Sequence, residues 1–435
     1  MNIELILIVM AAAFAAAKWK KLSIEMCMLL SAVAGGLAGA VINTPPLSQL
    51  VRHLVEGTFT YFDVMLVFST ATIFISIIAE SGGVNYVVRG IIKAFYTKRI
   101  LALLLLMFVI LIPGALTGAG SISILTVGAP CALALGYLGI PKRKVAAILF
   151  IVAGLSAVAP PINIWAMIIS AGTAIPYVGF ELPLGIPVLL LGAFTVFTLG
   201  WKREKKQPLE EVLKEMPEVP EGMSFWRVLL PFLVFFGLVM ISRLLPFSLP
   251  ILGLPLEFSI AAVVALIVSP KKINILALSR DTMKMLLPLL ATMAVVGSLQ
   301  QIMTVTGIRG LISFLTISTP IVLLYILLVF LIPVSEGVLT YGGAAIIGIP
   351  LVWFLDSVGL HATVVIAGLS LIWPLGDGLP PTALIGRLTV MITKYEGSYW
   401  SFLRATWLPW IVITITGILM IIFSAKLAFL VHWSM

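Results

Sequence analysis

The chain has 435 residues, of which 61% are hydrophobic and only 10% are charged, and its formal net charge is +9. Soluble domains average about 45–50% apolar and about 25% charged residues, so this composition predicts an all-α polytopic membrane protein. The positive net charge therefore does not indicate nucleic-acid binding. The composition also excludes a large soluble catalytic domain. Cys27 and Cys131 lie in apolar stretches and have neither a metal-binding spacing nor a disulfide pattern.

Apolar segments long enough to cross a bilayer follow one another along the chain, since about 20 helical residues span the hydrocarbon. They run over 2–17, 22–43, 57–80, 100–117, 121–138, 144–172 and 184–201, and then over 225–246, 252–269, 282–303, 320–335, 341–358, 362–393 and 405–425. The polar segment 202–224 separates the two sets and is predicted to be a cytoplasmic linker. The first apolar run continues into Lys18-Trp19-Lys20-Lys21, which favours a membrane span over a cleaved signal peptide.

The basic residues predict an orientation. We place the N-terminus outside and treat 100–138 and 320–358 as re-entrant hairpins that enter and leave on one side. Of the 27 Lys and Arg residues, this topology leaves only four outside, namely Arg52, Arg243, Arg309 and Lys426. Because basic residues gather on the cytoplasmic side, the pattern predicts a multi-pass protein of a bacterial or archaeal cytoplasmic membrane. Two full crossings in place of each hairpin would preserve the same orientation.

The second half of the chain repeats the first. Segment 111–161 aligns with 331–381 without a gap, and the alignment matches Leu-Ile-Pro, Gly-x-Pro, a lone glycine and a final Pro-Pro pair. Each half has an odd number of crossings, so the second repeat, 225–435, is predicted to be inverted relative to the first, 1–201. Inverted repeats with a re-entrant hairpin and a broken helix, here at 144–172 and 362–393, are typical of secondary transporters.

Polar and helix-breaking residues interrupt the apolar runs at matched places. The first hairpin tip holds Gly118, Gly120, Ser121 and Ser123, and the second holds Glu336, Gly337 and Thr340. The first break contains Pro160 and Asn163, and the second contains Asp377, Gly378, Pro380 and Thr382. A Pro-Pro pair cannot continue a helix, and the carbonyls that it frees must face protein, water or an ion. A single glycine-rich tip or Pro-Pro pair is usually only a turn or a kink. Two tips and two breaks at duplicated positions instead predict a binding site enclosed between them.

Glu336 and Asp377 fall inside the membrane in this topology, and the alignment pairs them with Leu116 and Ala157. A buried carboxylate is expensive unless it is paired, protonated or bound to a cation. We therefore interpret the two acids as cation-binding or proton-coupling groups. A structural hydrogen bond, or a salt bridge with Arg387, is the alternative. For Asn163, a helix cap and a ligand role are equally good interpretations.

The ordered motifs resemble those of the large membrane subunit of TRAP transporters, within the ion-transporter superfamily. The resemblance covers about 57–425 and rests on Glu80-Ser81-Gly82-Gly83, the 117–123 tip, Gly-Ile-Pro-Lys-Arg at 139–143 and both Pro-Pro breaks. It implies an elevator mechanism, sodium coupling, import of organic acids, a small membrane subunit and an extracytoplasmic substrate-binding protein. Departures from the family pattern at Asn163, Asp377 and Leu379 leave proton coupling and a stand-alone carrier open.

The resemblance and the interruptions together assign the candidate site. The expected cation-binding residues, with Na⁺ as the candidate metal ion, are Gly118, Gly120, Pro160, Glu336, Gly337, Gly378 and Pro380. The expected substrate-binding residues are Ser121, Ser123, Asn163, Thr340, Asp377 and Thr382. No cofactor is expected beyond Na⁺ or H⁺ as the coupling ion.

The sequence thus predicts a cation-coupled secondary transporter of small organic anions such as dicarboxylates or sugar acids. A sodium–proton antiporter or exporter of the same superfamily is the first alternative, and a channel-like protein without coupling is the second. An enzyme is not expected, because the histidines, which are His53, His361 and His432, form no nucleophile–base set at membrane depth.

Overall fold

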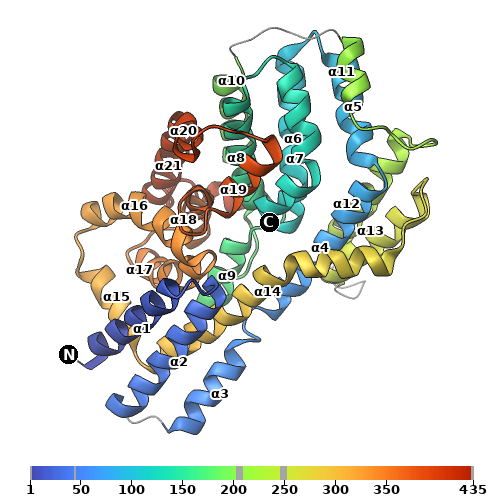
Figure 1. The fold of residues 1–435 in the computed structure, drawn as a ribbon. Coiled ribbons are helices and arrows are strands. Elements are labelled where there is room, and N and C mark those ends of the chain that lie inside the picture. The colour runs from blue at the N-terminus through green and yellow to red at the C-terminus, as the bar shows by residue number, and fades with distance from the viewer. Residues whose placement is uncertain (1, 44–45, 202–208, 245–251, 433–435) are drawn as a thin grey trace.

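The computed structural model describes residues 2–43, 46–201, 209–244 and 252–432. Within these ranges the chain is helical and contains no strand (Figure 1). The helices of the first half are α1 (Asn2–Trp19), α2 (Ile24–Asn43), α3 (Leu47–Gly57), α4 (Phe62–Glu80), α5 (Gly83–Phe95), α6 (Arg99–Thr117), α7 (Gly120–Tyr137), α8 (Lys142–Val158), α9 (Ile164–Thr173) and α10 (Glu181–Gly200).

The second half follows the same plan after the short helix α11 (Leu209–Glu215). Its elements are α12 (Phe225–Leu244), α13 (Leu254–Val268), α14 (Ile275–Val305), α15 (Ile308–Ser318), α16 (Ile321–Leu339), the π-helical η1 (Ala344–Gly348), α17 (Ile349–Ser357), α18 (Ala362–Ile372), the 3₁₀-helical η2 (Trp373–Gly378), α19 (Leu384–Thr393), α20 (Tyr399–Ala405), α21 (Trp407–Ile422) and α22 (Phe429–His432).

Among the described residues, 8 helices are long and apolar enough to cross a membrane. The pair α20–α21, which is bent by 55°, adds a ninth if it forms one span. The predicted class, an all-α polytopic membrane protein, is therefore confirmed. The predicted span 57–80 lies within the candidate span Leu47–Glu80, in which the amphipathic helix α3 precedes α4.

The two halves match in backbone conformation as well as in sequence. Helices α8 and α9 span 142–158 and 164–173, and at the aligned positions of the second half α18 with η2 spans 362–378 and α19 spans 384–393. Pro160-Pro161 and Pro380-Pro381 are both joined by cis peptide bonds. Left-handed residues also recur in matched pairs, at Gly82 and Gly307, Gly139 and Gly359, and Ala174 and Lys394.

The hairpins of the two halves differ in their packing. In the first, α6 and α7 pack along each other and reverse direction at Gly118, which has φ +70°. In the second, α16 packs chiefly against η2, whereas α17 packs against α15, α18 and α9. The second tip also reverses later in the chain, because its positive-φ residue is Thr340, whereas the ungapped alignment pairs Gly118 with Val338. This difference changes which residues of the two repeats are equivalent near the tip.

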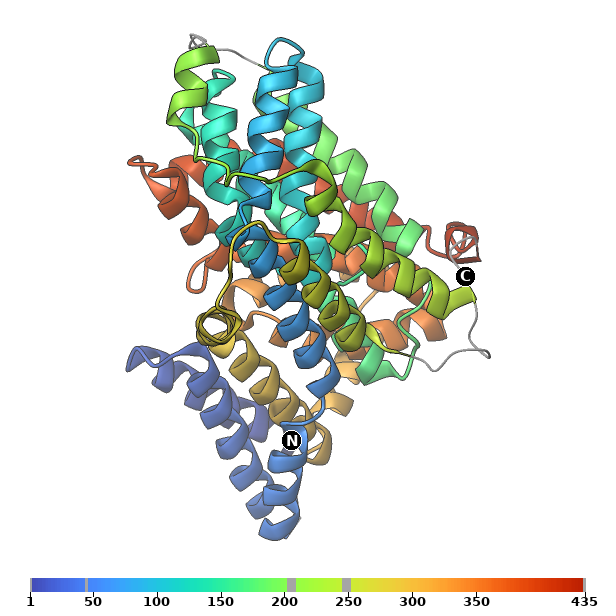
Figure 2. The same ribbon diagram turned by 90° about the vertical axis from the view of Figure 1, so that its right-hand side faces the viewer.

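Helices α1, α2 and α3 form an arm that projects from the rest of the molecule and packs on α14 (Figure 2). Two glycines permit a close crossing at its base. An added Cβ would lie 2.4 Å from the Ser298 Cα at Gly57, and 2.1 Å from the Gly57 carbonyl oxygen at Gly297. The arm is thus joined to the long helix α14 by direct backbone contact.

The linker packs against the base of the first hairpin where it is described. Residues 202–208 of the predicted linker 202–224 lie outside the described residues. Beyond them, Arg89 donates to the Met216 carbonyl over 3.4 Å, and the Tyr137 hydroxyl contacts the Glu215 carboxylate. Nearby, the buried Arg99 donates to the Gly200 carbonyl over 3.0 Å. A cation at the C-terminus of α10 complements the helix dipole, so Arg99 helps to hold α6 against α10.

Candidate functional site

The second hairpin tip and the second break form one compact joint. A Cβ added to Gly376 would lie 2.1 Å from the Pro333 carbonyl oxygen and 2.6 Å from the Glu336 Cβ. The backbone of η2 therefore lies directly on α16. On the other side of the Pro-Pro pair, Thr382 donates to the Gly337 carbonyl from its backbone N–H over 3.1 Å and from its hydroxyl over 3.0 Å. Tip and break are thus linked by steric contact and by hydrogen bonds.

Two carboxylates are buried in this joint. Glu336 is 1% exposed and Asp377 is 5% exposed, and their charges interact. The Trp165 indole N–H donates to the Glu336 Oε2 over 2.8 Å. The ring of Tyr341 lies 5.0 Å from the Trp165 ring, centroid to centroid. Since Trp165 belongs to α9 of the first repeat, the carboxylates lie where the two repeats meet.

The carboxylates have no basic partner among the described residues. The ion pairs there are Arg52–Glu56, Lys271–Glu80 and Arg280–Asp281, all of them exposed. Arg387, the alternative partner considered for Asp377, instead donates to the Pro381 carbonyl over 2.9 Å. No described hydrogen-bond donor reaches the Asp377 carboxylate. Two adjacent buried acids without a counter-ion must bind a proton or a cation to remain buried.

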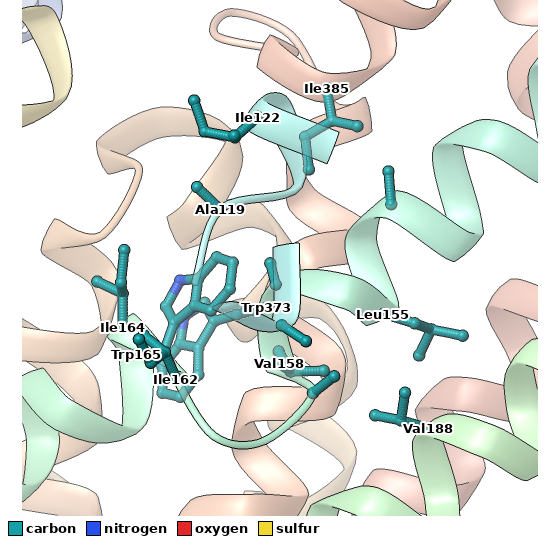
Figure 3. Close-up of a cluster of buried hydrophobic side chains, with 14 of the residues drawn as sticks. Ala119, Ile122, Leu155, Val158, Ile162, Ile164, Trp165, Val188, Trp373 and Ile385 are labelled. Carbon is teal, nitrogen blue, oxygen red and sulfur yellow. The ribbon is translucent and has the colours of Figure 1, made fainter. Parts of the chain in front are cut away.

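The first hairpin tip and the first break form a second joint, shown in Figure 3 around Ala119, Ile162 and Ile164. The Ile162 N–H donates to the Ala115 carbonyl over 3.1 Å. A Cβ on Gly118 would lie 2.7 Å from the Ile164 side chain, and one on Gly120 would lie 2.3 Å from the Ala153 carbonyl oxygen. The same tip-to-break contact is therefore made in both halves, but apolar residues line it in the first.

Asn163 is the polar exception in the first joint. It is fully buried, and its Oδ1 accepts from the Ala166 N–H over 3.0 Å, which caps α9. Its Nδ2 atom is buried and has no hydrogen-bond partner. The cap interpretation is thus supported by geometry, and the unpartnered amide leaves two N–H donors beside the N-terminus of α9. A helix N-terminus with free donors is suited to an anionic group.

Other candidate residues are placed away from this meeting point or are already bonded. The Ser123 hydroxyl donates to the Ile110 carbonyl within the first hairpin, and Ser121 is buried. The Thr340 hydroxyl donates to the Leu339 carbonyl over 2.7 Å. Pro160 lines an apolar cavity of about 500 Å³ against α12, and the Gly378 carbonyl accepts from the Tyr399 hydroxyl over 2.7 Å. Pro380 precedes the cis bond of the second break.

Sequence reasoning misses Trp165 and Tyr341. Both are aromatic residues in apolar runs, and such residues usually belong to the core. Only their closeness in sequence to the polar interruptions could have indicated that they line the site. Trp165 lies close after Asn163 in the first break, and Tyr341 lies inside Thr340-Tyr341-Gly342-Gly343. A buried indole N–H needs an acceptor, and in a membrane protein the acids are the strongest acceptors to consider.

The described residues contain no group of three or more His, Cys, Asp or Glu side chains that could hold a metal ion. The larger cavities there are apolar, as in the 440 Å³ cavity between α16 and α21. An alkali cation at the carboxylates would have to use backbone carbonyl oxygens beside the two acids, as hard cations do.

We expect Trp165→Phe to tighten the binding of the proposed coupling ion without loss of the ring packing against Tyr341, because the lost hydrogen bond stabilises the ionised Glu336 carboxylate. A hydrogen bond to a charged group contributes about 1.5–3 kcal/mol, so the apparent affinity for the ion should rise by about tenfold or more. Ion-dependent thermal stabilisation of the purified protein measures this. Trp373→Phe is the matched control, because that indole donates only to the Ser335 hydroxyl, over 3.3 Å. Equal effects of both changes would contradict a special role for Trp165.

No protein-family model matches the sequence, and no curated protein matches it. Among solved structures, the chain is similar to the YdaH transporter of Alcanivorax borkumensis, whose crystal structure is described as revealing an unusual topology. The identity is 13%, the similarity covers 89% of this chain and 90% of that chain, and the TM-score is 0.60. At this identity the similarity shows the fold alone. The chain is thus a multi-pass membrane protein with the fold of that transporter.

Proposed function

We propose that the protein is a cation-coupled secondary active transporter of small organic anions such as dicarboxylates or sugar acids. The observation that carries this proposal is the buried pair Glu336 and Asp377, which lies between a hairpin tip and a helix break and has no described basic partner. The fold shared with a transporter supports it. The protein would act in a bacterial or archaeal cytoplasmic membrane, with its N-terminus outside.

The coupling ion, Na⁺ or H⁺, would neutralise the two acids. While both are ionised, they repel an anion and carry a large desolvation penalty. A bound cation or proton removes the repulsion, so the anion binds best to the ion-loaded protein. Of the expected cation-binding residues, Gly378 and Pro380 would supply backbone carbonyl ligands, whereas the Gly337 carbonyl already accepts two hydrogen bonds from Thr382. In the first repeat, Pro160 corresponds to Pro380, and Gly118 and Gly120 lie at the hairpin tip.

The anion would bind at the N-terminal end of α9. The free amide of Asn163 and the positive end of the helix dipole both favour negative charge. Trp165 lies in the first turn of this helix and contacts Glu336, so the anion and cation sites share one element. Ser121, Ser123, Thr340 and Thr382 remain the hydroxyl candidates on the two tips and the second break.

An elevator motion fits the packing. Both tips and both breaks contact each other and would move together against a scaffold that includes α4, α14 and the α1–α3 arm. A TRAP-type version of this proposal adds a small membrane subunit and an extracytoplasmic substrate-binding protein. Co-purification with such partners from the native membrane would support that version.

Uptake into vesicles reconstituted with the purified protein tests the proposal. An inward Na⁺ or H⁺ gradient should drive labelled succinate or a sugar acid above its equilibrium level, and the uptake should saturate with substrate. Protein-free vesicles are the control. Accumulation that is indifferent to both gradients would overturn the coupling, and non-saturating flux would indicate a channel.

One observation favours a second candidate, a sodium–proton antiporter or exporter. The described site has two acids and no basic side chain for an anionic substrate. In that case Na⁺ added outside should drive proton movement from vesicles with no organic anion present. Proton movement that requires the organic anion would exclude antiport.

A further inference from the structure

Arg309 is a basic side chain with unsatisfied donors, and it lies apart from the carboxylate pair. It stands in the first turn of α15, where its Nη1 donates to the Thr304 hydroxyl over 3.2 Å. Its Nε and Nη2 atoms are buried and have no hydrogen-bond partner. The guanidinium stays charged in proteins, and buried donors are nearly always paired. The described residues therefore supply no acceptor for these two donors.

The two free atoms are those that form the side-on edge of the guanidinium. The guanidinium carbon lies 4.9 Å from the centre of the Trp353 ring on α17. Trp353 holds the plane of the group, and Thr304 on α14 holds the Nη1 end. The remaining Nε–Nη2 edge presents two parallel N–H groups, which is the geometry that binds both oxygens of a carboxylate.

Helix stability does not explain an arginine at this position. A cation in the first turn opposes the helix dipole, whereas an anion at the same end is stabilised by it. None of the ion pairs among the described residues involves Arg309. A carboxylate on the free edge would satisfy both the guanidinium and the N-terminus of α15.

The surroundings connect this position to the proposed transport site. The buried Tyr61 interacts electrostatically with Arg309, and its hydroxyl donates to the Gln300 Oε1. A Cβ added to Gly172, at the end of α9, would lie 3.3 Å from the Gln300 Nε2. Helices α15 and α17 pack against each other, and α17 also packs on α9 (Figure 1). The far end of α9 carries Asn163 and Trp165.

We propose that Arg309, held by Trp353 and Thr304, is a carboxylate-recognition site separate from Glu336 and Asp377, and that it receives the transported anion at the extracytoplasmic side. The identity of the ligand rests on the proposed function. The chemistry of the site, a bidentate oxyanion contact, rests on the geometry of Arg309 alone.

Concentration-dependent thermal shift of the purified full-length protein measures the binding. The probes are sodium benzoate and sodium succinate, with neutral benzamide as the uncharged analogue. We expect at least one carboxylate to stabilise the wild type and benzamide to have no effect. Arg309→Gln should weaken the apparent affinity by about tenfold or more, and Arg309→Lys by roughly fivefold, because lysine cannot make the bidentate contact. Arg52→Gln, an exposed arginine paired with Glu56, should leave it unchanged.

Three results would overturn the site: a wild type that responds to neither carboxylate, an Arg309→Gln variant that binds as the wild type does, or a bound anionic phospholipid that benzoate does not displace. Native mass spectrometry with and without anionic lipid detects the third, which would identify a lipid phosphate as the ligand. Because this assay needs no ion gradient, its outcome is separable from the proposed function. Carboxylate binding at Arg309 together with gradient-insensitive uptake would refute only the coupled transport.

Discussion

Glu336→Gln is expected to abolish ion-dependent acceleration of uptake while the protein is still made and inserted. Glutamine keeps the shape of the side chain and can still accept from the Trp165 N–H, which donates to Glu336 over 2.8 Å. It removes the charge that a coupling ion must neutralise. Coupling between two ligands is typically about 5–150-fold in affinity, so a loss of up to about 100-fold in gradient-driven uptake is expected. Labelled-substrate uptake with imposed Na⁺ and H⁺ gradients measures it.

Asp377→Asn should have the same effect, and the double variant should be no worse than either single change, because the two acids act as one unit. Asp63→Asn is the matched control, since Asp63 lies exposed in the first turn of α4. Thermal stability separates mechanism from folding, because removing a buried unpaired charge should not lower it. If both single variants keep the ion dependence of the wild type, the two acids have a structural role and do not bind the coupling ion.

Local backbone features of this fold could be predicted from the sequence. Pro160-Pro161 and Pro380-Pro381 end helices whatever surrounds them, and glycine at 118 permits the positive φ of a sharp reversal. These constraints act within a few residues, so the duplicated pattern locates both breaks and both tips. The helix α3 escapes prediction because its apolar residues form one face only, whereas a membrane span is recognised as a continuous apolar run.

Long-range contacts could not be predicted in the same way. The Trp165–Glu336 hydrogen bond joins residues 171 positions apart, and the Trp353–Arg309 contact joins α17 of the second hairpin to α15, which precedes that hairpin. Neither pair shares a local motif. The first contact arises from the packing of one repeat on the other, and the second from packing between helices of the second repeat.

The predicted register of the second tip is also wrong. The ungapped alignment pairs Glu336 with Leu116, but the later reversal of the second tip places Glu336 where the first repeat has Gly114. The contacts demonstrate this: a Cβ on Gly114 would lie 1.9 Å from the Ser156 Oγ, and a Cβ on Gly376 would lie 2.6 Å from the Glu336 Cβ. Ser156 and Gly376 are equivalent in the alignment of the two repeats. Each repeat therefore has one glycine at this helix crossing. In the first repeat it is Gly114 on the hairpin helix α6, and in the second it is Gly376 on η2 of the broken helix.

Because Gly376 has no side chain, Glu336 can pack against the backbone of η2 at this crossing. Gly376→Ala is therefore expected to abolish transport. The added methyl would meet the Pro333 carbonyl oxygen at 2.1 Å and the Glu336 Cβ at 2.6 Å. Both are main-chain or first side-chain atoms of α16, which cannot rotate away, so η2 must separate from the tip. Overpacking of this kind costs about 1–3 kcal/mol or more, and it displaces both acids at once.

We therefore expect Gly376→Ala to lower the melting temperature and to abolish gradient-driven uptake together, unlike Glu336→Gln, which should affect uptake alone. Gly136→Ala is the matched control, because no atom lies within 4 Å of an added Cβ in that exposed turn of α7. Alanine should be neutral there or stabilise the helix by about 0.5–1 kcal/mol. A Gly376→Ala protein with normal uptake would mean that the joint between tip and break is not the site of coupling, since no carboxylate geometry would survive that displacement unchanged.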